Sequence, residues 1–520
     1  MTRGVWSGST ASGRGAVLTA AALSTTVAAA TVAVVAVTGG VASATTGQAS
    51  AVAGAAPAVG VAATYNIRSY GAKGDGNANE ASAFEKAITA ANAAGGGIVQ
   101  VPSGTYKVAS TVHLRSNVTI QLDSGATVRG AGSGYDAPES NPNDNYQDYG
   151  HSHFHNAMFY GDRLSNIGFT GSGTIDGGGN LITGNPKSGQ ADKIISLTRC
   201  KGLTLNGITL RRGGHFAALI NGCDNVRSDR LTIRTADDRD GWNIISTTNV
   251  TITGADIAAN DDALVFKSDY ALGQKLPNGH VTVTNSKLSA GCCNALMFGS
   301  ETCGDFTDYD FSAITITGAG KSGLGLVSMD GAKISNVRYR DITMSGTESP
   351  IMLKVGTRKR CGNNPGVGDI SDIHFTNITG TDAGKYSPTI WGQSGHEVRN
   401  VTFDNVKLNV PGGNGTMDPT KVPSDNGDYN PRSIGTRPAY GWYLHHVNGL
   451  RFTNSSVSFS DNDKRPAVIA NAGADITFDR FSAERGSGSP FDLGFQNING
   501  YCVTGSGSPR VSASGSSKSC

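Results

Sequence analysis

Short stretches in which every second residue is apolar recur along the chain, separated by turns rich in asparagine and glycine. A period of two places the apolar side chains on one face of a strand. Leu203, Val226 and Val250 are equivalent positions in successive stretches, 23 and 24 residues apart, which is typical of a solenoid repeat. The stretches are 201–210, 224–233, 248–257, 279–288, 332–344, 370–379, 397–408 and 448–459.

This repeat predicts an all-β fold, a right-handed single-stranded parallel β-helix. Each strand is too short to bury its own apolar face, and coils stacked about 4.8 Å apart would build one continuous core. An immunoglobulin-like or jelly-roll sandwich is the alternative. It is less favoured because it requires no fixed period and uses hairpin turns.

The segment 77–97 predicts an N-terminal capping helix. Its apolar residues recur at helical spacing, and Gly95 provides a stop signal. Such a helix would cover the open end of the solenoid, where the first coil otherwise exposes unpaired strand edges. The apolar residues are Phe84, Ala87, Ile88 and Ala91.

The segment 134–156 breaks the repeat and predicts a long loop over one face. It contains His151, His153 and His155, which would share one face if the segment were extended. A metal site is one interpretation. Polar lining of a surface is favoured over it, because no fourth ligand is evident.

The first 64 residues contain arginine but no aspartate, glutamate or lysine, and they include an apolar run at 16–37. This pattern, with the small residues at 42–44, predicts a signal peptide and a secreted, extracellular protein without a membrane partner after cleavage. An uncleaved membrane anchor stays open. The predicted organisation is 1–44 signal peptide, 45–64 Ala/Gly/Val-rich linker, 65–502 β-helix domain and 503–520 Gly/Ser-rich tail.

The composition adds three constraints. The net charge of +2 gives no reason to expect nucleic acid or an anionic membrane as partner, and 71 glycines, about twice the usual frequency, indicate many turns. Eight cysteines in the exported part favour disulfides, with Cys502 and Cys520 as the preferred pair at the tail. Structural zinc is disfavoured, because the only close pair is the adjacent Cys292 and Cys293.

Two adjacent carboxylates, Asp261 and Asp262, stand at the start of the apolar run 263–266. Repulsion and desolvation both oppose this arrangement, so it needs a reason. Asp240 lies 21 positions before Asp261, one turn of the solenoid, which places it on the adjacent coil. Turn capping or calcium binding would explain the pair alone, although calcium requires about six to eight oxygen ligands.

Several motifs occur in one order and give the chain a family resemblance. From about residue 65 to 502 it resembles glycoside hydrolase family 28, the polygalacturonase-like pectin hydrolases. The segment 65–76 also looks like the opening of pectate-lyase-fold proteins. The motifs are "GSGTIDGGG" (171–179), "CDNVRSDRLTI" (223–233), "DRDGWNI" (238–244), "NDDALVFKS" (260–268), "LMFGSE" (296–301) and "SGLGLVSMDGAKISNVRYRDI" (322–342).

The resemblance implies an inverting hydrolase without metal or cofactor. Asp240 matches the aspartate of the family's Asn-Thr-Asp-Gly motif, and Asp261 and Asp262 match its Asp-Asp pair. Asp261 would be the general acid, and Asp240 and Asp262 would activate water on the opposite side of the sugar, with about 6.5–9.5 Å between the carboxyls. The candidate substrate-binding residues are Asn294, Arg239 and Lys267.

Two departures from the family pattern concern the substrate. Asn294 stands at the histidine of the family's Gly-His-Gly, and Gly325 and Val327 stand at its uronate-binding Arg-x-Lys. A glycine and a valine cannot pair with a carboxylate. Either the substrate has changed, for example to a neutral glycan, or cations in the segment 354–361 compensate.

Three functions are therefore compared. A secreted inverting hydrolase of pectic or related polysaccharides is favoured, acting as a monomer on a polysaccharide or oligosaccharide. A polysaccharide lyase would need a base with calcium or basic residues beside a uronate, and no such set is evident. A non-catalytic glycan-binding β-helix is the third, because the histidine and the Arg-x-Lys positions are lost.

Overall fold

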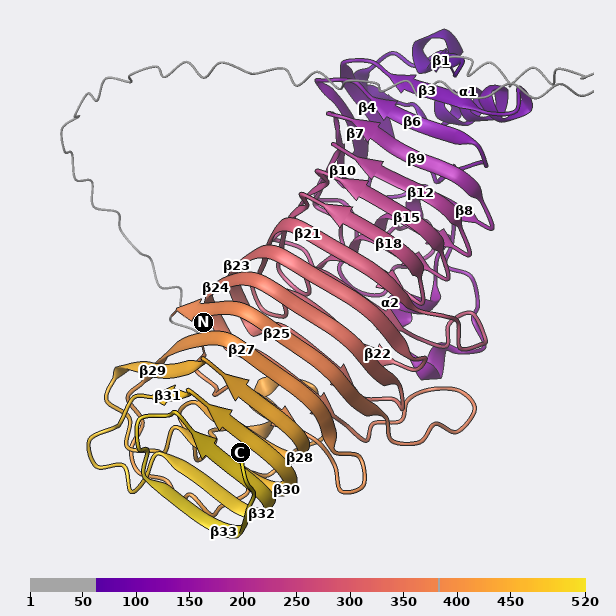
Figure 1. Ribbon diagram of the computed structural model, residues 1–520. Helices are drawn as coiled ribbons and strands as arrows, with labels where there is room; N and C mark the ends of the chain where they lie inside the picture. Colours follow the sequence, from indigo (N-terminus) through magenta and orange to yellow (C-terminus); the bar gives the residue numbers. More distant parts are fainter. Residues whose placement is uncertain (1–61, 382–383) are drawn as a thin grey trace, which may run out of the picture. The chain divides into compact units, whose positions relative to one another are not determined.

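A computed structural model of the chain describes residues 62–381 and 384–520. The predicted signal peptide and most of the predicted linker lie outside these residues. The described residues form one compact unit of stacked parallel strands, a right-handed parallel β-helix, which confirms the predicted fold class (Figure 1). Among the described residues, no helix has the length and apolar character needed to cross a bilayer.

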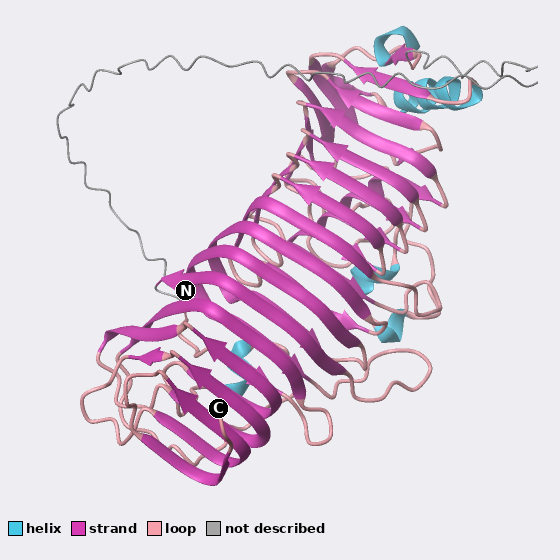
Figure 2. Cartoon of the chain, in the orientation of Figure 1, coloured by secondary structure: helices cyan, strands magenta, loops and turns pink. Residues whose placement is uncertain are grey.

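The strands follow the chain from coil to coil (Figure 2). The first coils contain β1 (Thr64–Asn66), β2 (Asp75–Asn79), β3 (Gly97–Val101), β4 (Gly104–Val108), β5 (Val112–His113), β6 (Val118–Leu122), β7 (Ala126–Gly130), β8 (Ala157–Asp162), β9 (Ser165–Gly171) and β10 (Thr174–Asp176). The middle coils contain β11 (Lys193–Thr198), β12 (Lys201–Asn206), β13 (Thr209–Arg211), β14 (Phe216–Asn221), β15 (Asp224–Asp229), β16 (Thr232–Thr235), β17 (Asp240–Ile245), β18 (Thr248–Thr253), β19 (Asp256–Ala259), β20 (Leu264–Ser268), β21 (Gly279–Ala290) and β22 (Leu296–Thr302). The last coils contain β23 (Phe306–Ser328), β24 (Lys333–Val355), β25 (Asp369–Thr381), β26 (Thr389–Trp391), β27 (Val398–Gly412), β28 (Trp442–Thr453), β29 (Ser456–Asp461), β30 (Val468–Asp479), β31 (Ser482–Ala483), β32 (Leu493–Thr504) and β33 (Val511–Ser517). The helices are η1 (Ile67–Tyr70), α1 (Ala81–Ala93), η2 (Asp144–Tyr146), α2 (Tyr149–Ser152) and η3 (Pro431–Ile434).

The register of the strands matches the sequence repeat. Leu203 in β12 pairs with Val226 in β15, Val226 pairs with Val250 in β18, and Val250 pairs with Val281 in β21, all in parallel. All four side chains are buried. The predicted equivalence is confirmed, and parallel stacking at this register rules out the sandwich, which pairs neighbouring strands antiparallel.

Aromatic rings stack inside the later coils. Because equivalent positions lie directly above one another, rings of successive coils meet almost face to face, with centroids 4.5 to 5.0 Å apart. This ladder shows that the core is continuous along the solenoid. Its members are Phe311, Tyr339, Phe375, Phe403, Phe452 and Phe478.

The predicted N-terminal helix is present as α1, beside the first coils in Figure 1. It begins later than the pattern indicated, because residues 75–79 form β2 and pair with β4 instead. Phe84 and Ile88 on α1 are fully buried, and the helix packs against β3. Its role as a cap of the open end stays a prediction.

The Gly/Ser-rich segment 503–520 carries β33, which extends the sheet by pairing with β32. The predicted pairing of Cys502 with Cys520 is confirmed. Each of the eight cysteines is in a disulfide, and the other pairs are Cys200–Cys223, Cys292–Cys293 and Cys303–Cys361.

Candidate active site

The three aspartates predicted to act together lie on adjacent coils. The amide of Gly241 donates to the carbonyl of Asp262 (2.8 Å), and the amide of Asp261 donates to the carbonyl of Arg239 (3.1 Å). These bonds align β17 with β20, so that Asp240 stands next to Asp262. The coil length of the sequence repeat therefore brings the carboxylates together as predicted.

The three carboxylates differ in exposure and in their partners. The Asp240 side chain is 5% exposed and accepts a hydrogen bond from Asn243 Nδ2 (3.0 Å). Asp262 is buried as well. The Asp261 side chain is 17% exposed and pairs with the Arg239 guanidinium (3.0 Å). Asp261 is thus the member of the trio that a ligand on the surface can reach most directly.

Burial and the repulsion between neighbouring carboxylates favour the protonated forms of Asp240 and Asp262. Burial, with the charges of Asp261 and Asp262, raises the pKa of Asp240 to about 8, although Lys267 opposes the shift. Burial and the neighbouring Asp261 also raise the pKa of Asp262. At mildly acidic pH Asp240 therefore retains its proton, so the site carries less negative charge than three ionised carboxylates would.

Lys267 lies beneath the trio. Its Nζ is 3.6 Å from Asp240 Oδ2, 3.6 Å from Glu301 Oε2 and 3.0 Å from His151 Nε2. The side chain is 5% exposed, so the structure places this predicted substrate-binding residue against carboxylates inside the protein. Lys267 therefore lies between the carboxylates of Asp240 and Glu301.

His151 and Glu301 also lie at the site, although the sequence did not indicate either residue as part of it. His151 lies in α2, within the predicted loop, and Glu301 ends the "LMFGSE" motif. Arg360 donates a hydrogen bond to Glu301 Oε1 (2.7 Å). The Cys303–Cys361 disulfide links the segment that contains Arg360 to the end of β22. The position of Glu301 in a recognised motif was the one available signal.

A metal centre is not built from these groups. Asp148, His151 and Glu301 offer ligand atoms within 4.8 Å of one another, but the cations Lys267 and Arg360 already contact them. The three loop histidines do not converge on one point. Each lies nearest a different carboxylate, His151 to Glu301, His153 to Asp144 and His155 to Glu139.

Asn294 is fully buried and holds Asp262. Its Nδ2 and its amide both donate to Asp262 Oδ1, at 2.7 and 3.1 Å, and its own Oδ1 accepts from the amide of Ser322 (3.1 Å). The structure therefore places Asn294 as a support of the carboxylate.

The positions that replace the family's Arg-x-Lys are apolar and covered. Val327 packs in a small cluster with Val265, Met297 and Met329, and Tyr429 lies against it. A Cβ at Gly325 would stand 2.4 Å from Met297 Sδ, so no longer side chain fits there unless Met297 moves. Neither position offers a cation that could bind a substrate carboxylate.

Two cations of the segment 354–361 are engaged elsewhere. Lys354 is fully buried and pairs with Asp425 (2.5 Å). Arg358 binds Asp330 through two nitrogens, at 2.9 and 2.6 Å. The compensation considered from the sequence is therefore not in place for these two residues.

The raised pKa of Asp240 predicts a stability change with pH. Above about pH 7.5 the buried histidines His151 and His215, with lowered pKa values in the folded protein, are neutral both folded and unfolded. Folded Asp240 then still holds part of a proton that the unfolded chain has released, so the free energy of unfolding should fall by about 1 kcal/mol as pH rises from about 7.5 to 9. Asp269, with a pKa of about 7, adds to the fall. Urea unfolding across this range should show a smaller fall for Asp240→Asn, and an equal fall would contradict the burial argument.

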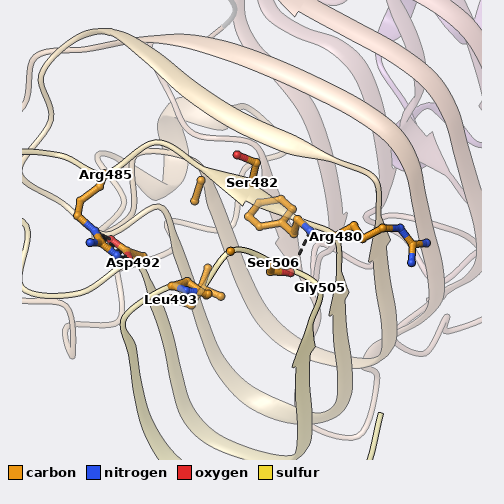
Figure 3. A pocket seen from close by; sticks show the side chains of 11 residues that line it. Arg480, Ser482, Arg485, Asp492, Leu493, Gly505 and Ser506 are labelled. Carbon is orange, nitrogen blue, oxygen red and sulfur yellow. Dashed lines mark hydrogen bonds and ion pairs between the residues drawn. The ribbon is translucent and has the colours of Figure 1, made fainter.

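A separate cavity lies in the last coils, away from the trio. Figure 3 shows that Arg485 and Asp492 face each other at its rim, where they form an ion pair of 2.5 Å. Arg480, Ser482 and Ser506 also line it. Arg480 pairs with Asp479, outside the lining, and none of the three aspartates contributes to the cavity.

Comparisons with known proteins find one family model and several similar relatives. The model of the glycosyl hydrolases family 28 matches residues 95–427. An endo-polygalacturonase of Pectobacterium carotovorum subsp. carotovorum is 26% identical over 352 residues, covering 63% of this chain and 83% of the relative. A polygalacturonase of Malus domestica is 24% identical over 373 residues, covering 67% and 75%.

Solved structures support the fold. An exopolygalacturonase from Thermotoga maritima superposes with a TM-score of 0.58 at 17% identity, covering 76% of this chain and 92% of that one. A family 28 exopolygalacturonase of Yersinia enterocolitica gives 0.57 at 18% identity, covering 86% and 79%. With the family model matching well over half of the chain, this protein belongs to glycosyl hydrolase family 28 and is an O-glycosyl hydrolase.

Proposed function

We propose that this protein is a secreted, monomeric, inverting hydrolase that cleaves glycosidic bonds of pectic or related polysaccharides with Asp240, Asp261 and Asp262. The observation that carries the proposal is the trio on adjacent coils, two members buried and one open to the surface. The polygalacturonases among its relatives support a pectic substrate class.

The roles follow from exposure and position. Asp261 gives its proton to the glycosidic oxygen as the bond between that oxygen and the anomeric carbon breaks. A water molecule attacks the same carbon from the opposite face, and its proton passes to Asp240 or Asp262. Lys267 and Asn294 hold the two water-activating carboxylates in place.

The experiment that tests the proposal is a polymer panel. Pectic, rhamnogalacturonan and neutral polysaccharides are incubated side by side, and the release of reducing ends is measured. Proton NMR of the first product then reports the anomer, and inversion is expected. Retention of configuration, or release from no polymer, would contradict the proposal.

The pH dependence of hydrolysis is a further prediction. Water activation requires an ionised Asp240 or Asp262, and both have raised pKa values, about 8 for Asp240. We expect kcat/KM to increase with pH well above the range near 4 where an ordinary aspartate ionises. A rate that is already at its plateau at pH 5 would show that the base is an unperturbed carboxylate.

A polysaccharide lyase and a non-catalytic binder make different predictions. Lyase chemistry needs cations beside a uronate, and Lys354 and Arg358 are held in ion pairs. Ultraviolet absorption by an unsaturated uronate product would nevertheless establish the lyase. Binding of a panel polymer without any product would favour the binder.

A further inference from the structure

Cys292 and Cys293 form a disulfide between neighbouring residues, in the turn that joins β21 to β22. This turn lies one coil beyond the trio, since the amide of Cys292 donates to the carbonyl of Asn260 (2.6 Å). Both sulfur atoms and a carboxylate oxygen of Asp261 lie within 4.8 Å of one another. Cys292 is exposed, so part of the disulfide faces solvent beside the proposed acid.

The disulfide is not needed to hold the turn. Bonds to the neighbouring coils already set the backbone, from the amides of Gly291 to Ala259 (2.9 Å) and of Ala295 to Ser322 (3.1 Å). A disulfide stabilises mainly through the loop that it closes in the unfolded chain, and adjacent residues close none. The Cys303–Cys361 bond, which spans 58 residues, is the contrasting case.

A metal site does not account for the pair either. Cysteine binds metals as the thiolate, and both sulfurs are consumed in the disulfide. The remaining chemical property of the pair is a rigid, polarisable and apolar surface. The position of the disulfide beside Asp261 decides which ligand can contact this surface.

A glycosidic oxygen must approach the Asp261 carboxyl to within about 2.6–3.2 Å to receive its proton. A sugar on one side of that oxygen can then reach the neighbouring coil, where the sulfurs are within 4.8 Å of the same carboxylate. We propose that the Cys292–Cys293 disulfide is a sugar-binding surface that selects, at the position next to the cleaved bond, a sugar turning its C–H face toward the sulfurs. This rests on the proposed hydrolase function.

The test compares two disulfide deletions. In Cys292→Ala/Cys293→Ala the sugar-binding surface is removed, and in the control Cys502→Ala/Cys520→Ala an equal number of cysteines is removed at the tail. On the best panel polymer we expect KM of the first variant to rise about tenfold, which equals about 1.4 kcal/mol, with a smaller change in kcat. The control should keep its KM and lose thermal stability.

A second variant keeps the test valid if the first variant fails to fold. Cys292→Ser/Cys293→Ser keeps the side-chain size but replaces sulfur by hydroxyl groups, and it should raise KM as well. Circular dichroism and Tm identify any variant that fails to fold. An unchanged KM in a folded Cys292/Cys293 variant, or an equal rise in the control, would overturn the proposal.

Failure of the hydrolase function would be recognised separately. If the parent releases no reducing ends, gel retardation by the panel polymers still compares its affinity with that of Cys292→Ala/Cys293→Ala. Weaker retardation of the variant supports the sugar-binding surface. Equal retardation, or no retardation of the parent, overturns it.

Discussion

Asp261→Asn is expected to lower kcat/KM about 10³-fold on the best panel substrate while the fold is preserved. The asparagine keeps the shape of the side chain but has no proton to give to the leaving oxygen. Asp261 is the most exposed member of the trio, so no buried carboxylate can replace it at the same place. Initial rates and far-ultraviolet circular dichroism measured on the same preparations test both parts.

A matched control makes this result specific. Asp237→Asn changes an exposed aspartate of the same acidic cluster and should leave kcat/KM within about twofold of the parent. An aryl glycoside with a good leaving group should restore much of the rate of Asp261→Asn, because such a group departs without protonation. A variant that retains most of the parent's rate would remove Asp261 from the acid role.

Polygalacturonate should be a poor substrate, turned over about 100-fold more slowly than the best uncharged or mixed glycan. A charge-assisted hydrogen bond to a carboxylate contributes about 1.5–3 kcal/mol, roughly tenfold or more for each bond. Gly325 and Val327 remove two such bonds. Initial rates are measured on polygalacturonate and on the other glycans at equal concentrations of chain ends and of glycosidic linkages. The ratio of these rates is the test.

The structure strengthens this expectation beyond the missing charges. Met297 fills the space beside Gly325, and Tyr429 covers the cluster that contains Val327. Lys321 donates to the Tyr429 hydroxyl (2.8 Å) and forms no ion pair among the described residues, so it is a cation beside this cluster that could compensate. Efficient turnover of polygalacturonate that is abolished in Lys321→Met, or in variants of Lys354 or Arg358, would show that the uronate site has moved.

Part of the site could be predicted because it depends on periodicity. The coil length sets which residues lie on adjacent coils, so Asp240 could be placed beside Asp261 and Asp262 from spacing alone. The ordered motifs then indicated the family. The start of α1 was less predictable, because pairing of residues 75–79 with β4 competes with helix formation there.

The environment of each side chain could not be predicted in the same way. Lys267 and Asn294 were expected to meet the substrate, but the structure surrounds both with protein groups. Their partners are distant in sequence. Lys267 contacts His151, 116 residues away, through a loop that interrupts the repeat and carries no periodic signal.

The sequence by itself determined the solenoid, its register and the meeting of the three aspartates, because alternation and repeat length act locally and are copied from coil to coil. Only the tertiary structure decided which carboxylate is exposed, and how Tyr429 and the Cys292–Cys293 disulfide border the site. Burial, and with it the pKa of Asp240, depends on the segments that fold over a coil. Contacts between such non-repeating segments are long-range, so no local pattern encodes them.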